Sequence, residues 1–97
     1  MTIRQEIERQ LHSEYATKTR LEAIKNGIRS AIRAVEADID RCNSLLNYES
    51  NLSRRVAIHN EIESHEYDLR SFRASLDSVT SELREINYTI ANLERQC

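Results

Sequence analysis

The stretch that decides the fold is residues 43–56, "NSLLNYESNLSRRV", which lies near the middle of the 97-residue chain. It contains neither Gly nor Pro, although apolar residues recur at helical spacing on both sides of it. Its central part, residues 47–55, gathers four side chains that favour helix N-caps because they hydrogen-bond to nearby backbone: Asn47, Ser50, Asn51 and Ser53. The fold depends on whether the chain reverses direction here or continues as one helix.

The second half carries a regular seam of mostly apolar residues. Its steps alternate between four and three, which is the heptad pattern of a helix packed lengthwise against another helix. The seam runs through Ile58, Ile62, His65, Leu69, Phe72, Leu76, Val79, Leu83, Ile86, Ile90, Leu93 and Cys97.

The first half has a seam of its own, extended toward the N-terminus by Ile3, Ile7 and Leu11 and weakened between Leu11 and Leu21. An eleven-residue step from Leu21 to Ile32 predicts a local relaxation of the supercoil. The best part comprises Leu21, Ile24, Ile28, Ile32, Val35, Ile39, Cys42 and Leu46.

The two seams do not join into one straight helix. Leu46 and Ile58 are twelve residues apart, and about 100° per residue would rotate the second seam by roughly 120° from the first. We therefore predict an all-α, coiled-coil-like antiparallel hairpin. Its single domain, 1–97, has a helix over about 3–47, a turn over about 48–52 with a left-handed Asn, and a helix over about 53–96. Thr2 and Gln5 fit a capping box at the start.

Small residues follow the seam of the first helix. Gly27 is the alternative place for a break, which would give three helices. We favour instead a continuous helix whose small-residue strip allows close approach of another helix. A lone two-helix hairpin buries little core, so the sequence predicts a homodimer that forms a four-helix bundle. The self-association strip comprises Ala23, Gly27, Ala31 and Ala34.

The composition excludes several classes of protein. Charged residues make up 31% of the chain and nearly cancel at a net charge of -2, which argues against a dedicated nucleic-acid binder. No apolar run is long enough to cross a membrane, and the N-terminus does not resemble a signal peptide. Two distant cysteines favour free thiols. We expect a cytoplasmic protein.

Catalytic motifs are missing from the sequence, so we predict no enzyme, no catalytic residue and no cofactor. Residues 59–68, "HNEIESHEYD", contain histidines and carboxylates at helical spacing, including the four-residue pair Glu61 and His65. However, isoleucine occupies the position where a di-iron bundle needs a carboxylate. We therefore predict no metal site, a polar seam role for His65, and plain core roles for Cys42 and Cys97.

Two surfaces are candidates for partner binding. If residue i faces roughly residue 100 − i across the hairpin, four arginines form a basic patch and five acidic residues gather nearby. The arginines are Arg29, Arg33, Arg70 and Arg73; the acidic residues are Glu36, Asp38, Asp40, Glu61 and Glu63. The turn is the second surface, since Tyr and Arg are favoured interface anchors. It presents Tyr48, Glu49, Asn51, Leu52, Arg54 and Arg55.

These features predict a non-catalytic protein-binding module, a small regulator, inhibitor or adaptor that blocks or scaffolds a protein partner. Small inhibitors encoded by viruses or mobile elements often have these features, a short helical chain without catalytic motifs. The alternatives are a chaperone or structural subunit of a larger assembly such as a secretion apparatus, and a nucleic-acid-associated protein using the arginine patches. The turn lacks the Trp-x-Gly signature of a family of secreted helical hairpins of similar length, so the sequence predicts no family.

Overall fold

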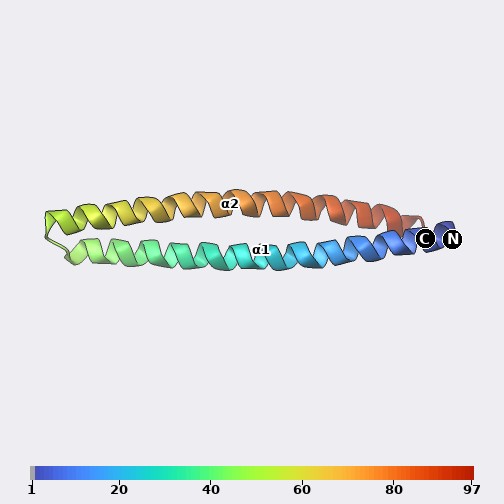
Figure 1. Ribbon diagram of the computed structural model, residues 1–97, viewed down its shortest axis with the longest axis horizontal. Helices are drawn as coiled ribbons and strands as arrows, with labels where there is room; N and C mark the ends of the chain where they lie inside the picture. The colour runs from blue at the N-terminus through green and yellow to red at the C-terminus, as the bar shows by residue number, and fades with distance from the viewer. Residues whose placement is uncertain (1) are drawn as a thin grey trace. The chain divides into compact units, whose positions relative to one another are not determined.

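The computed structural model describes residues 2–97, which form two α-helices and no strand (Figure 1). Helix α1 spans Ile3–Tyr48, α2 spans Leu52–Arg95, and residues 49–51 connect them. The predicted all-α helical hairpin is thus confirmed. Helix α1 continues through Gly27, so the three-helix alternative is wrong.

The chain divides into two compact units, each containing a segment of both helices. The turn unit is Ile28–Ser75, and the terminal unit is the chain up to Gly27 together with Leu76–Cys97. Within each unit, the segments of α1 and α2 lie side by side and run in opposite directions (Figure 1).

Helix α1 begins with the predicted capping box. The Thr2 hydroxyl accepts a hydrogen bond from the Gln5 backbone N–H at 3.1 Å, and the Gln5 side-chain oxygen accepts one from the Thr2 N–H at 2.9 Å. These two bonds satisfy donors that the first turn of a helix leaves unpaired.

The turn is built by side chains. Asn51 caps α2, because its side-chain oxygen accepts a hydrogen bond from the Arg54 N–H at 3.1 Å. Arg55 closes α1, because its Nη1 donates to the backbone carbonyls of Leu46 and Glu49 at 2.7 and 2.8 Å. No residue of 2–97 has a positive φ, so the predicted left-handed asparagine is wrong. The arginine satisfies the final carbonyls that a left-handed residue would otherwise help to pair.

The seam of α1 keeps a strict alternation of four and three along its length, with polar residues at some positions. Lys25 is half-buried whereas Ile24 is 44% exposed, so the seam passes through Lys25 and not through the predicted Ile24. Maintaining the heptad phase outweighs the local advantage of placing Ile24 on the seam. The buried and half-buried seam residues are Ile7, Leu11, Glu14, Lys18, Leu21, Lys25, Ile28, Ile32, Val35, Ile39, Cys42 and Leu46.

The seam of α2 follows the predicted positions from Ile58 to Leu93, all of which are buried or half-buried. Cys97 is exposed, because α2 ends at Arg95 and the chain leaves the helix before reaching the seam position. The expectation of a core role for Cys97 was therefore wrong. The best-buried apolar residues are Ile7, Leu21, Leu83 and Ile90 in the terminal unit and Cys42 and Ile62 in the turn unit.

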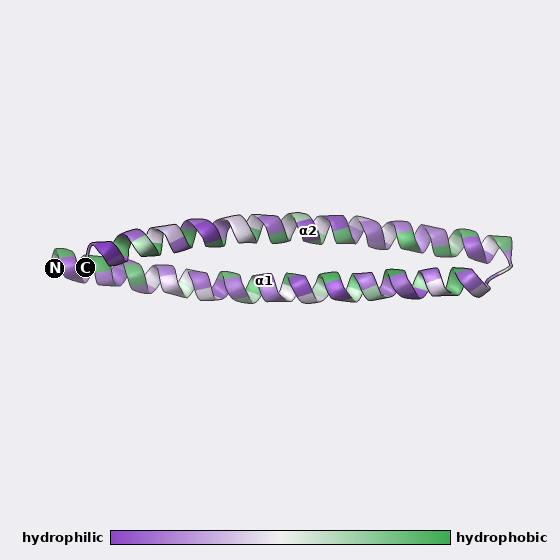
Figure 2. Cartoon of the chain, turned by 180° about the vertical axis from the view of Figure 1, so that it is seen from behind, coloured by the Kyte–Doolittle hydropathy of each residue, from purple (hydrophilic) through white to green (hydrophobic). Residues whose placement is uncertain are grey.

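Hydrophobic residues recur along both helices and alternate with polar ones (Figure 2). Because each helix packs one stripe against a single neighbour, no large side chain of the described chain is completely buried. Neither helix contains a segment long and apolar enough to cross a lipid bilayer.

Candidate functional site

Large apolar side chains are exposed on both sides of the turn. We define the turn surface as Leu45, Tyr48, Leu52, Arg54 and Val56. Tyr48 is 90% exposed and Leu52 75% exposed. Leu45 and Tyr48 are three residues apart on α1, and Leu52 and Val56 four apart on α2, so each pair shares a helix face. All four apolar members lie within a dozen residues of one another in the chain.

The polar residues predicted at the turn divide into two groups. The first group helps to build the turn and comprises Glu49, Asn51 and Arg55. The bonds of Asn51 and Arg55 are described above. In addition, Glu49 Oε1 accepts a hydrogen bond from the Asn51 N–H at 2.9 Å. Arg54 remains largely exposed, with only a 3.9 Å contact to the Glu49 carboxylate. Of the charged turn residues, Arg54 is therefore the one whose side chain stays largely exposed.

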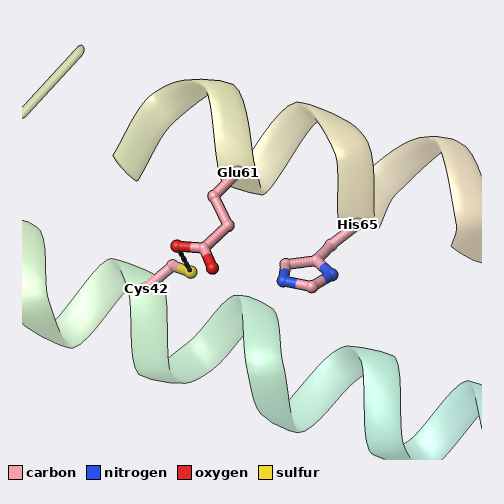
Figure 3. A group of neighbouring side chains, drawn as sticks. All are labelled: Cys42, Glu61 and His65. Carbon is pink, nitrogen blue, oxygen red and sulfur yellow. Dashed lines mark hydrogen bonds between the residues drawn. The ribbon is translucent and has the colours of Figure 1, made fainter. Parts of the chain in front are cut away.

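A second constellation joins the two helices inside the turn unit. Cys42 on α1 is buried, and Glu61 and His65 lie one helical turn apart on α2. The thiol donates a hydrogen bond to Glu61 Oε2 at 3.5 Å. One ligand atom from each of the three residues lies within 4.8 Å of the other two. Figure 3 shows the carboxylate and the imidazole pointing from α2 toward Cys42.

The surroundings of this cluster are negative. Burial raises the pKa of the Cys42 thiol, and the hydrogen bond to Glu61 and the negative charges of Glu61 and Asp38 raise this pKa further. The nearby charge of Arg41 opposes the rise, although this arginine is paired with Asp38 at 2.8 Å. The negative surroundings therefore favour the protonated thiol over the thiolate when no metal cation is bound.

Two of the four arginines predicted as a basic patch, Arg70 and Arg73, lie beside acidic residues in the turn unit. Arg73 forms an ion pair with Glu36 at 3.6 Å. With Arg70, it lines an open groove of about 450 Å³ that contains both acidic and basic side chains. This ion pair departs from the predicted count of 100 − i, because the interlocking of seam residues sets the register. The groove is lined by Glu36, Ile39, Asp40, Glu66, Leu69, Arg70 and Arg73. Arg29 and Arg33 are exposed on α1.

The small-residue strip lies on α1, with Ala23 and Gly27 in the terminal unit and Ala31 and Ala34 in the turn unit. Ala31 is half-buried and the other three are exposed. A Cβ placed on Gly27 would meet nothing within 4 Å. The hairpin itself therefore does not require a glycine at this position.

Sequence reasoning missed two parts of these sites. Leu45 and Val56 were not predicted at the turn surface, although both could have been found as apolar residues near the turn that lie outside the seams. The meeting of Cys42 with Glu61 and His65 was also missed. The four-residue spacing of Glu61 and His65 indicated that these two side chains share a face of α2. Which residue of α1 lies against them depends on the register across the turn.

No known protein family, no curated protein and no solved structure matches this chain.

Proposed function

We propose that this chain is a non-catalytic protein-binding module whose turn surface contacts a protein partner. The observation that supports the proposal is the concentration of exposed apolar side chains around the turn. Exposing Leu45, Tyr48, Leu52 and Val56 to water is unfavourable, and clustered exposed apolar groups mark interaction sites. Tyr48 and Arg54 are residue types that dominate binding energies when a partner covers them.

The proposed module acts as a homodimer that forms a four-helix bundle. The thin core supports this, since no large side chain of residues 2–97 is completely buried by the single hairpin. The terminal unit offers a surface for the second copy, because Ile24 is exposed beside the exposed small residues Ala23 and Gly27. Small residues allow two helix backbones to approach closely, and Ile24 would gain the apolar cover that it lacks.

The proposed mode of action is occlusion or scaffolding, as expected of a regulator, inhibitor or adaptor. A short turn that carries apolar groups can fill a pocket on a partner while the helices behind it stay unchanged. The cytoplasm is the proposed location, because Cys42 and Cys97 are both free thiols and reducing compartments keep thiols in that form.

The test is capture of the partner from an extract of the source cells with tagged protein, repeated with variants. Leu52→Ser and Tyr48→Ala remove apolar groups at the turn, and Tyr67→Ala and Tyr88→Ala are matched controls, since these tyrosines are also exposed but lie away from it. We expect one stoichiometric protein that both turn variants lose and both controls retain. A partner retained by every variant would refute the turn surface as the contact.

Other outcomes distinguish the alternatives. Recovery of the chain alone would favour a self-assembling structural subunit. Salt-sensitive capture of nucleic acid, lost on Arg29→Glu with Arg33→Glu, would favour nucleic-acid association. Sedimentation equilibrium tests the dimer, which we expect Ile24→Glu to convert to monomer while an exposed position on α2, Tyr88→Glu, leaves it intact. A monomeric parent protein would refute the four-helix bundle.

A further inference from the structure

We propose that Cys42, Glu61 and His65 form a zinc site that clamps α1 to α2 inside the turn unit. The three residues come from two helices and converge on one point, with one ligand atom of each within 4.8 Å of the others (Figure 3). The site is independent of the proposed partner binding, since none of the three belongs to the turn surface.

The separations suit a tetrahedral metal. Zinc binds thiolate sulfur at about 2.3 Å, imidazole nitrogen at about 2.0–2.1 Å and carboxylate oxygen at about 2.0–2.2 Å, which places neighbouring ligand atoms roughly 3.3–3.6 Å apart. The Cys42 sulfur and the Glu61 Oε2 are already 3.5 Å apart. The remaining separations, all within 4.8 Å, close by rotation of the exposed Glu61 side chain and the half-buried His65 side chain.

The donor set selects the class of metal. A thiolate and an imidazole favour zinc and similar transition metals, whereas calcium and magnesium prefer oxygen ligands throughout. One thiolate, one carboxylate and one neutral imidazole carry a total charge of −2, which a divalent cation cancels. The negative groups that raise the pKa of Cys42 attract a cation for the same reason.

Binding exchanges a proton for the metal. The Cys42 thiol releases its proton to solvent as the sulfur–zinc bond forms, the Glu61 carboxylate gives up its hydrogen bond from the thiol, and neutral His65 donates a nitrogen lone pair. Three protein ligands leave a fourth position for water. Because Cys42 lies on α1 and the other two ligands on α2, the metal links the helices without a covalent bond between them.

The first experiment is a titration of the full chain carrying Cys97→Ser with cobalt(II) chloride, followed by competition with zinc chloride. The Cys97 substitution removes the exposed thiol, so that only Cys42 can produce a sulfur-to-cobalt charge-transfer band. We expect one cobalt per chain, the visible spectrum of tetrahedral cobalt, and loss of the signal on adding zinc. Absence of the charge-transfer band, or one metal shared by two chains, would overturn the site.

Variants then assign the ligands. Cys42→Ala should abolish the charge-transfer band, and His65→Ala and Glu61→Gln should each weaken cobalt affinity by at least about 10-fold, since even groups that only orient a metal ligand commonly contribute that much. His59→Ala is the matched control, an exposed histidine on α2 outside the cluster, and should leave affinity unchanged.

A band that survives Cys42→Ala, or an affinity indifferent to His65→Ala, would refute the proposal. Circular dichroism without metal checks that each variant is folded. Zinc should raise the thermal midpoint of the parent more than that of His65→Ala; an equal rise in both would also refute the three-residue site.

Discussion

Arg55 should stabilise the hairpin far more than its neighbour Arg54. Its Nη1 donates to the carbonyls of Leu46 and Glu49, which lie at the end of α1 where the helix offers them no partner. Replacement by methionine keeps a long, helix-favouring side chain and removes the charge and both hydrogen bonds. The change therefore isolates the capping interaction.

The magnitude follows from the two bonds. A hydrogen bond from a charged donor is worth about 1.5–3 kcal/mol, and water can partly replace this one at the half-buried turn. We take about 1 kcal/mol for each bond, or about 2 kcal/mol for Arg55→Met. A chain of this size has a total stability of roughly 5–15 kcal/mol, so the melting temperature should fall by about 8 °C or more.

The assay is urea and thermal unfolding followed by circular dichroism, with all proteins at the same concentration so that association affects them equally. The control is Arg54→Met, which removes an exposed arginine whose contact to Glu49 is 3.9 Å long and should cost less than about 0.5 kcal/mol. Equal losses for the two variants, or no loss for Arg55→Met, would refute the assignment of Arg55 as the cap of α1.

Three further predictions concern the terminal unit. Gly27→Ala should stabilise the monomeric hairpin by about 1 kcal/mol, since a Cβ meets nothing within 4 Å, and urea unfolding at low protein concentration would show a loss if the space were occupied. Lys25→Leu should add about 1 kcal/mol because position 25 is half-buried on the seam; unchanged or lower stability would contradict the assigned heptad phase. The hydrogen bond to Glu94 raises the pKa of Tyr15 above 10.0, so its stabilisation is complete below pH 10 and is lost as the pH rises through the folded-state pKa. The melting-temperature difference between the parent protein and Tyr15→Phe should therefore shrink above about pH 10, and a difference that is constant to higher pH would contradict the bond.

The fold followed from spacing because a heptad seam is a long-range pattern that individual polar residues do not destroy. Lys25 shows this, since it occupies a seam position that sequence reasoning gave to Ile24 on grounds of hydrophobicity alone. Over many turns, a change of phase would displace every later seam residue, whereas a lysine can bury its alkyl stem and extend its charge to water. Phase was thus the better guide than residue type.

The candidate sites were less predictable because they depend on register. The sequence identified Glu61 and His65 as a pair on one face of a helix, yet nothing local to that helix specified Cys42 as their neighbour. The same problem affected Arg73, whose ion pair with Glu36 the count of 100 − i did not predict. Register across a hairpin is set by the turn and the interlocking seam together, and Arg55 gave no sequence signal of its capping role.

The turn also determines the order in which contacts form as the chain folds, because the loss of chain entropy on forming a contact grows with the length of the loop that it closes. The Arg55 bond to the Leu46 carbonyl joins residues 9 apart in sequence, whereas the bond from Tyr15 to Glu94 joins residues 79 apart. Closing the longer loop first would cost about 2 kcal/mol more in chain entropy. Folding should accordingly nucleate at the turn and proceed as a zipper toward the chain ends. Interactions at the turn then govern the rate of folding, and those in the terminal unit govern mainly the rate of unfolding.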